Sequence, residues 1–459
     1  YVGYRYFDSF GVEVLYPFGY GLSYGKTELA AYSFAATGDR LTVTATVENT
    51  GDVYAARQVM QVYLSCPQGK LEQPKQKLCA FAKTKLLAPG EEETLTMEFR
   101  LSDFASFDEE TCSYVLEKGT YYIRLGADSR STTVCGAVFL PQNVTTLVLS
   151  DRMGHVPEGF KTLTAEGVPA YTYPGEKEEL EFASQHAVRI SAREFRTVKV
   201  KYRSPARPLR RGRVDLRLRD VMEKTCSLSE FVAGMDASDL CSLVCGIGMD
   251  ISGIPESMQQ DPDFKPPFNG ILGGGGMKVR GAAGETADLY EKYGIPPISL
   301  ADGPAGIRIS QKIKDDEGEV IGQQLCTAFP VGSLLACSWD GEVLRRFGEA
   351  VAAEMTEYGV ELWLAPGMNI HRNPLCGRNF EYFSEDPLVT GFCAAAITKG
   401  VQKHGVGVTI KHFAGNNQED LRTNSNDIVS QRALREIYLK GFEIAVKQAQ
   451  PYSVMTSYN

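Results

Sequence analysis

Two polar clusters follow short apolar runs in the second half of the chain. Residues 377–387 read GRNFEYFSEDP, and the apolar run at 406–410 leads into Lys411-His412. Cationic, carboxylate and imidazole groups gathered at strand ends are what an α/β barrel uses to build a polar pocket. Such a pocket can hold a hydroxyl-rich ligand through charge-assisted hydrogen bonds. The alternative interpretation is that these are solvated loop charges that bind no ligand.

Further candidate side chains occupy similar positions along the sequence. Asp302 follows a strand-like run and lies among glycines and a proline that fix its turn. Its carboxylate can accept two hydrogen bonds from adjacent hydroxyls, or it can simply stabilise its own turn. Arg422 lies in the loop after the second cluster, and Tyr458 follows the last apolar run. In extended backbone Lys411 and His412 face opposite sides, so both reach one ligand only where the strand breaks.

Alternating helices and strands must position these groups. Helices are predicted at 341–358, at 389–404 and after Ser430, because apolar residues recur there with helical spacing. Strands are predicted from the apolar runs at 298–300, 361–365, 406–410 and 453–457. The last three runs recur about every 45 residues, which fits one strand, one helix and their loops in a parallel barrel or an open sheet.

The first part of the chain has a different pattern. Residues 27–150 alternate apolar and polar positions between turn signals, which predicts an antiparallel sandwich. Strands are expected at 41–47, 59–64, 93–99 and 119–126. Residues 1–25 are rich in Tyr, Phe and Gly, and we expect an ordered loop there rather than a helix. The end of a connector at 151–220 is basic, which we interpret as docking on an acidic body rather than as a site for an acidic partner.

Composition excludes some classes of function. The 459 residues predict two or three domains, and the net charge of −9 argues against nucleic-acid binding as the main role. No apolar run approaches the roughly 18–20 residues that span a bilayer, and Tyr1–Tyr24 lack a signal-peptide pattern. Eleven cysteines without paired spacing predict a reducing, cytoplasmic location. Cys241 and Cys245 share one face of an apolar helix and are predicted to be small core residues rather than metal ligands.

Six runs, in this order, resemble the β-glucosidase branch of glycoside hydrolase family 3. They are residues 300–308, 377–387, 410–413, 416–419, 432–439 and 455–459. The resemblance implies an α/β plus all-β protein: a (β/α)8-type TIM barrel, incomplete in this chain, with a fibronectin type III-like β-sandwich.

The resemblance also divides the chain into parts. Residues 1–25 are similar to the C-terminal tail of the family's α/β sandwich domain, and residues 26–150 to its fibronectin type III-like domain. Residues 151–220 are the connector, and residues 221–459 are the N-terminal part of the barrel domain. This order resembles the circularly permuted arrangement of some anaerobic bacterial members, and we expect the enzyme to be incomplete at both ends.

The resemblance implies roles for the candidate residues. Asp302, Arg378, Lys411 and His412 match positions that hold the terminal glucose in subsite −1, and Arg422 and Tyr458 match positions that line the same subsite. Family members are retaining enzymes that use two carboxyl groups. The nucleophile Asp is expected beyond Asn459 and the acid/base Glu before Tyr1, so no catalytic residue is assigned in this chain. Three acidic residues are expected instead to order the loop that carries Arg378: Glu381, Glu385 and Asp386.

The implied activity is that of a retaining, exo-acting β-glucosidase. It would remove terminal non-reducing β-D-glucose from cello-oligosaccharides or aryl glucosides, with no cofactor and no metal. The alternatives are a β-xylosidase, an arabinosidase or an N-acetylhexosaminidase of the same family, or a non-catalytic sugar-binding or scaffold protein. The expected partners are a small carbohydrate and the missing segments of the same enzyme, with no nucleic acid and no membrane. The oligomeric state is left open.

Overall fold

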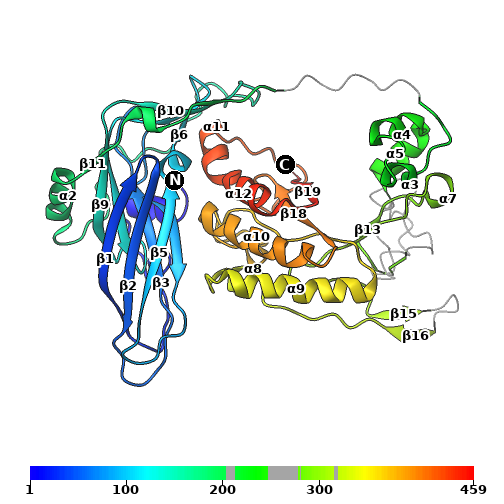
Figure 1. Cartoon of the computed structure of the whole chain (residues 1–459), viewed down its shortest axis with the longest axis horizontal. Coiled ribbons are helices and arrows are strands. Elements are labelled where there is room, and N and C mark those ends of the chain that lie inside the picture. Colours follow the sequence, from blue (N-terminus) through cyan, green and yellow to red (C-terminus); the bar gives the residue numbers. More distant parts are fainter. Residues whose placement is uncertain (203–211, 247–277, 280, 315–318, 459) are drawn as a thin grey trace.

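A β-rich half and an α/β half lie side by side in the molecule (Figure 1). The computed structural model describes residues 1–202, 212–246, 278–279, 281–314 and 319–458. Asn459, the last residue of the sixth family-like run, lies outside these ranges, as do residues 203–211 of the basic end of the connector. No helix in the described ranges is both long enough and apolar enough to cross a membrane.

Alternation of apolar and polar residues builds the β-rich half. In β2 (Arg40–Asn49) every second side chain from Leu41 to Val47 is fully buried, as the sequence predicted. One sheet has the order β1-β2-β5, and a larger sheet has the order β11-β9-β8-β3-β4. Their other strands are β1 (Thr27–Thr37), β5 (Glu92–Arg100), β3 (Val59–Ser65), β4 (Lys77–Lys83), β8 (Gly119–Gly126), β9 (Thr132–Leu140) and β11 (Val188–Arg189).

The connector docks on this half. Its strand β11 pairs in parallel with β9, and β12 (Val198–Lys199) pairs in parallel with β10 (Val144–Val148) in a third sheet of order β12-β10-β7-β6. Helix α2 (Glu176–Gln185) lies against β9, where Glu179 accepts a hydrogen bond from the N–H of Val134 at 2.8 Å. The remaining elements here are β6 (Ser106–Asp108), β7 (Ser113–Leu116) and the 3-10 turns η1 (Leu101–Phe104) and η2 (Ala192–Glu194).

The expectation of a loop without helix at residues 1–25 was wrong. Tyr4–Ser9 form helix α1, with Gly3 at its N-cap. The glycines and prolines that suggested a loop lie at Gly3 and from Gly11 onward, so they bound the helix without interrupting it. Tyr4 is only 2 % exposed, and burial of this kind stabilises a helix that is too short to form on its own.

A small helical unit precedes the barrel strands. Leu216, Phe231, Met235 and Tyr293 form its buried core. Its helices are α3 (Leu218–Met222), α4 (Leu228–Gly234), α5 (Ala237–Cys245) and α7 (Tyr290–Tyr293).

The prediction that Cys241 and Cys245 are core residues was wrong. Both are exposed on α5, because Leu240 and Leu243 of the same helix pack toward the core of the unit. The helical spacing placed the two cysteines on one face correctly, but it did not say which face of α5 is covered. All eleven cysteines are free thiols.

A half-barrel forms the centre of the α/β half. The sheet order is β13-β14-β17-β18-β19, in which β14, β17, β18 and β19 run parallel and β13 runs antiparallel to β14. Within the described ranges these strands do not close, so a complete TIM barrel is not seen. The strands are β13 (Gly284–Glu285), β14 (Ser299–Ala301), β17 (Leu362–Trp363), β18 (Gly407–Phe413) and β19 (Ser453–Thr456), and a separate hairpin joins β15 (Lys312–Lys314) to β16 (Val320–Gln323).

Helices cover one face of this sheet (Figure 1). The predicted helix at 341–358 is α9 (Gly341–Tyr358), which Asp340 caps. Ser430 caps α11 as predicted, accepting a hydrogen bond from the N–H of Ala433 at 3.2 Å. The others are α8 (Gly332–Ala336), η4 (Asn379–Glu381), α10 (Pro387–Gln402), α11 (Gln431–Ala433), the π-helical turn η5 (Leu434–Tyr438) and α12 (Lys440–Ala449).

Two glycines let α9 and α10 approach closely. A Cβ on Gly348 would lie 2.5 Å from the carbonyl oxygen of Ile397, and one on Gly400 would lie 2.2 Å from that of Arg345. Both distances are shorter than van der Waals contact, so a larger residue at either position must push the helices apart.

One hydrophobic core spans both halves of the molecule. Tyr4, Tyr63 and Leu78 from the β-rich half belong to the same buried cluster as Trp363 from the barrel sheet. At its rim, the ring of Phe81 on β4 lies 4.8 Å from that of Trp339 and 4.9 Å from that of Phe392, both on the barrel side. Arg57 forms an ion pair with Asp340 at 3.0 Å across the same junction.

Candidate functional site

The carboxyl ends of the parallel strands bring the predicted residues together. Asp302 directly follows β14, Lys411 and His412 lie near the end of β18, and Tyr458 follows β19. Arg378 lies in the long loop after β17, just before the turn η4. Because these strands are parallel and adjacent, their carboxyl ends meet at one edge, where α/β barrels place their sites.

Lys411 is the centre of the polar network. Its side chain is 3 % exposed, and its Nζ donates to Oδ1 of Asp302 at 2.8 Å. Arg308 donates to the other carboxylate oxygen of Asp302, also at 2.8 Å. Burial alone would raise the pKa of the Asp302 carboxyl, but the ammonium of Lys411 outweighs it and holds that pKa below its ordinary value.

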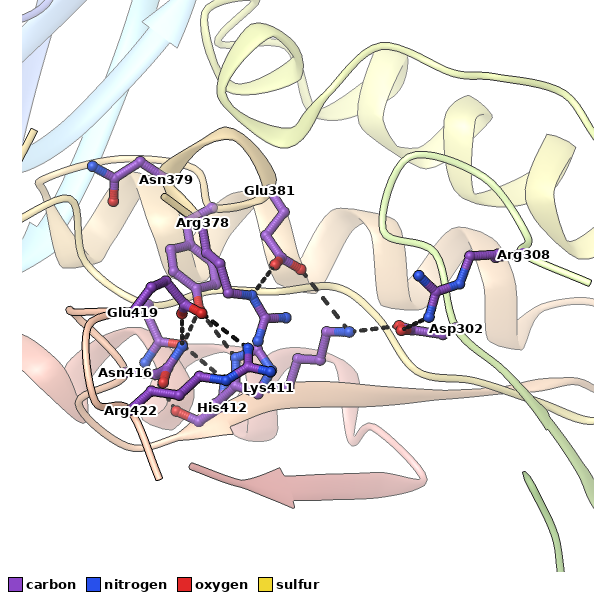
Figure 2. A network of polar contacts seen from close by, with 12 residues as sticks. Asp302, Arg308, Arg378, Asn379, Glu381, Lys411, His412, Asn416, Glu419 and Arg422 are labelled. Carbon is purple, nitrogen blue, oxygen red and sulfur yellow. Dashed lines mark hydrogen bonds and ion pairs between the residues drawn. The ribbon is translucent and has the colours of Figure 1, made fainter. Parts of the chain in front are cut away.

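Glu381 connects Arg378 to Lys411. Its Oε1 accepts a hydrogen bond from Nε of Arg378, and its Oε2 lies 3.9 Å from Nζ of Lys411. Figure 2 shows this carboxylate between the two cations, with Asp302 on the far side of Lys411. Burial by itself would lower the pKa of the Arg378 guanidinium, and the contact with Glu381 outweighs it and raises that pKa.

His412 is held from two directions. Its ring Nδ1 lies 3.1 Å from the hydroxyl of Tyr382, and Asn416 donates to that hydroxyl at 2.8 Å. The side chain of Asn369 pairs with both the backbone N–H and the carbonyl of His412, at 2.8 and 2.9 Å. Burial first, and then the charges of Arg378 and Lys411, lower the pKa of the imidazole to about 3, so His412 is neutral near neutral pH.

The strand breaks where both neighbouring side chains enter the network. The pairing register of β18 with β19 shifts between Ile410 and Phe413. The backbone of Lys411 turns instead toward the loop after β17, where its carbonyl accepts from the N–H of Met368 at 2.7 Å. Lys411 and His412 therefore both take part in the site, which the alternation of a regular strand would forbid.

Arg422 and Tyr458 form the outer part of the site. The guanidinium of Arg422 lies 4.6 Å from the centre of the Tyr458 ring, and it donates to Glu419 at 2.9 Å. The Tyr458 ring lies 6.1 Å from the ring of His412. Tyr458 is 48 % exposed, so an aromatic edge and a cation face solvent beside the buried network.

All six residues singled out from the sequence lie at this edge, in two adjacent groups of contacts. Glu381 and Lys411 link Asp302 and Arg378 in one group, and the other contains His412, Arg422 and Tyr458.

Sequence reasoning did not single out Asn369, Tyr382 or Glu419, which hold these groups in place. Asn416 and Glu419 belong to the fourth family-like run, which was the available signal. Tyr382 belongs to the second run. Asn369 acts through contacts with the backbone of His412 that no spacing in the sequence reveals.

Nothing in the described part of the chain groups three or more His, Cys, Asp or Glu side chains as a metal site would require. A groove of ≈ 350 Å³ lies elsewhere, between β4 and the start of α9, and none of the six residues lines it.

The fold and the site together define a strand-end polar site in a parallel β/α half-barrel that is joined to a β-sandwich. Residues 281–459 match the glycosyl hydrolase family 3 N-terminal domain, and residues 58–129 match the fibronectin type III-like domain. The chain thus carries a family 3 glycosyl hydrolase domain behind a fibronectin type III-like domain.

Relatives match along the whole chain. It is 38 % identical to a β-glucosidase of Ruminococcus albus over 100 % of its own length and 44 % of the relative's. The structure of a β-glucosidase from Paenibacillus barengoltzii matches 100 % of this chain and 47 % of that one, with a TM-score of 0.75 and 37 % identity. The chain therefore spans about half the length of these relatives. An exo-α-(1→6)-L-arabinopyranosidase of Bifidobacterium longum is 47 % identical over 37 % of this chain and 22 % of its own length.

Proposed function

We propose that this chain forms the glucose-holding part of a retaining, exo-acting β-glucosidase. The enzyme would release terminal non-reducing β-D-glucose from cello-oligosaccharides or aryl glucosides. The observation that carries the proposal is the position of Lys411, buried between the carboxylates of Asp302 and Glu381 at the strand ends. The β-glucosidases that match the chain over its full length support the same assignment.

The geometry suits the recognition of sugar hydroxyls. Asp302 is held ionised and keeps acceptor capacity for ligand hydroxyls, since a carboxylate offers about four lone-pair sites. Lys411 has three donors, and one of them is used on Asp302. His412 adds a neutral ring that carries no charge into the pocket. Tyr458 offers an aromatic surface of the kind on which a sugar ring can pack.

The bond-breaking groups belong to the rest of the proposed enzyme. In a retaining mechanism one carboxylate attacks the anomeric carbon, and a second carboxyl protonates the leaving oxygen and then activates water. Glu381 is given neither role, because it is 4 % exposed and one of its oxygens is bound to Arg378. In this proposal Asp302, Lys411 and His412 fix the sugar so that its anomeric carbon is presented to those carboxyl groups.

A second candidate is an exo-acting pentopyranosidase of the same family. The similarity to the B. longum arabinopyranosidase supports it, since that relative is 47 % identical over 37 % of this chain, close to the 49 % of a β-glucosidase of Acetivibrio thermocellus over the same share. A β-D-xylopyranose has the ring hydroxyls of β-D-glucopyranose but lacks the hydroxymethyl group. An α-L-arabinopyranose lacks it as well and has the opposite configuration at its 4-hydroxyl. A non-catalytic sugar-binding protein is the third alternative.

The test measures the hydrolysis of three aryl glycosides by the protein that contains this chain. We expect 4-nitrophenyl β-D-glucopyranoside to be cleaved with a higher kcat/KM than the β-D-xylopyranoside or the α-L-arabinopyranoside. A preference for either pentoside supports the second candidate, and sugar binding without cleavage supports the third. Proton NMR of the first product should show β-glucose, whereas α-glucose would exclude a retaining mechanism.

A further inference from the structure

Every cation in the polar network already has an internal carboxylate partner. Figure 2 labels four cationic side chains, and each of them lies at ion-pair distance from an acidic one. The pairs are Arg308 with Asp302, Lys411 with Asp302 and Glu381, Arg378 with Glu381, and Arg422 with Glu419. A site built to receive a phosphate or a carboxylate would be expected to leave at least one cation for the ligand.

Glu381 is the most deeply placed of these carboxylates. It is 4 % exposed and lies between the buried Lys411 and the partly buried Arg378, whereas Asp302 and Glu419 each contact an arginine that is at least 40 % exposed. Its Oε1 accepts from Arg378, while its Oε2 is buried without a hydrogen-bond partner and faces Lys411 at 3.9 Å. A buried acceptor left unpaired in this way is costly, so its retention beside Lys411 calls for a function.

Two glycines make room for Glu381 at this position. A Cβ on Gly367 would lie 3.2 Å from Oε2 of Glu381 and 3.1 Å from the ring of Tyr382. A Cβ on Gly332 would lie 2.5 Å from the carbonyl oxygen of Glu381. Close neighbours therefore restrict both the carboxylate of Glu381 and its backbone carbonyl.

We propose that Glu381 is a positioning residue that restricts this site to neutral sugars. It holds Arg378 and Lys411 in place, and its own charge opposes any second anion near them. A uronic acid or a phosphorylated sugar would bring such an anion into a buried region, where like charges repel strongly. A neutral hydroxyl meets no such repulsion and can accept from Lys411. This inference rests on the proposed function, because it concerns the sugar that the same site binds.

Glu381→Gln removes the charge of this side chain. It distinguishes a role in substrate specificity from a purely structural role in the loop. The probes are D-glucose, D-glucuronate and D-glucose 6-phosphate, each measured as an inhibitor of aryl β-glucoside hydrolysis by the protein that contains this chain. In the wild type we expect both anions to inhibit at least about tenfold more weakly than glucose. In Glu381→Gln we expect glucose to inhibit about tenfold more weakly, because Arg378 and Lys411 lose their shared partner. The ratio of anion affinity to glucose affinity should rise about tenfold, because the repulsion is gone.

Glu349→Gln is the matched control. Glu349 also accepts from an arginine and a lysine, Arg345 and Lys403, but it lies on α9 among exposed side chains. The same loss of charge there should leave all three inhibition constants unchanged.

Equal weakening of all three inhibitors in Glu381→Gln, or no change in any, would overturn the proposal. Should Glu381→Gln fail to fold, Glu381→Asp carries the test, because it keeps the charge and shortens the reach. Glu381→Asp must lower the affinity for glucose while the ratio of anion affinity to glucose affinity stays at the wild-type value. A raised ratio, or an unchanged affinity for glucose, overturns the proposal. A wild-type protein that neither cleaves the glucoside nor binds glucose would instead refute the proposed function.

Discussion

The hydroxyl of Tyr4 donates to Oδ2 of Asp386 at 2.9 Å, although 382 residues separate them in the chain. Asp386 is fully buried, and its other oxygen caps α10 by accepting from the N–H groups of Leu388 and Val389. Arg5 forms an ion pair with the same Oδ2 at 3.1 Å. Helix α1 is therefore bound to the end of the loop that carries Arg378.

Removing this carboxylate should destabilise the whole chain. Asp386→Ala leaves Arg5 buried without its partner and α10 without its cap, so we expect the free energy of unfolding to fall by about 3–5 kcal/mol. Tyr4→Phe removes the hydrogen bond to Asp386 and the one that the hydroxyl accepts from the N–H of Leu78 at 2.8 Å, and it should cost about 1–3 kcal/mol. Urea denaturation measures both, with Tyr20→Phe at a 49 % exposed position as the control. An Asp386→Ala protein as stable as Tyr20→Phe would contradict this account.

The neighbouring Glu385 predicts a pH dependence of stability. Burial raises the pKa of its carboxyl to about 6, and the charges of Asp386 and Asp8 add to it, while the N–H of Tyr4 and the charge of Arg5 oppose the rise. The folded state therefore binds the proton more tightly than the unfolded state. The resulting stability is fully present below the unfolded pKa of about 4.5 and is lost as the pH rises through about 6.

Glu385→Gln should remove this dependence. Between about pH 4.5 and 7 the wild type is expected to lose about 2 kcal/mol that the variant does not lose. Urea denaturation at a series of pH values measures the difference between the two proteins. Parallel pH profiles would show that Glu385 titrates alike in the folded and unfolded states.

Asp302→Asn and Lys411→Ala test the centre of the site. Each removes a charged group that the proposed function places against the sugar, and we expect kcat/KM for the aryl glucoside to fall by about 100-fold or more while the circular dichroism spectrum is unchanged. Lys403→Ala, at an exposed lysine at the C-terminal end of α10, should retain full activity. Unchanged kinetics in either site variant would remove that residue from the site.

His412 should not titrate in the physiological range. Because burial and the neighbouring cations lower its pKa to about 3, its ring should stay neutral from about pH 5 to 8. Its ring-proton NMR signal, assigned by its absence in His412→Gln, should keep one chemical shift over that range. A sigmoidal shift centred near pH 6.5 would place His412 in contact with water and outside the network.

Periodicity in the sequence was sufficient to predict the regular elements. The helix at 341–358 was predicted to the residue, because its apolar face is uninterrupted and Asp340 and Gly359 bound it. The strands that begin at residues 299, 362, 407 and 453 overlap the apolar runs from which they were predicted. Helix α1 was missed because its stability comes from packing against residues far along the chain, which local spacing does not show.

The sequence indicated that the candidate residues lie together, but not how they are connected. The family-like runs pointed to Asp302, Arg378 and Lys411, and the structure joins them through Glu381. That carboxylate was expected only to order a loop. Its contact with Lys411 depends on how the loop after β17 folds back over β18, and neither run alone contains this information.

The buried cluster that Tyr4, Tyr63 and Leu78 share with Trp363 bears on how shorter versions of this protein should be made. A cloning boundary at residue 150 or 220 would divide this shared cluster, although the β-sandwich also has a core of its own. Either fragment would expose apolar surface and would be expected to aggregate, even though each corresponds to a recognisable family module. Recombinant work on the candidate site therefore needs the β-sandwich to be co-expressed with the half-barrel.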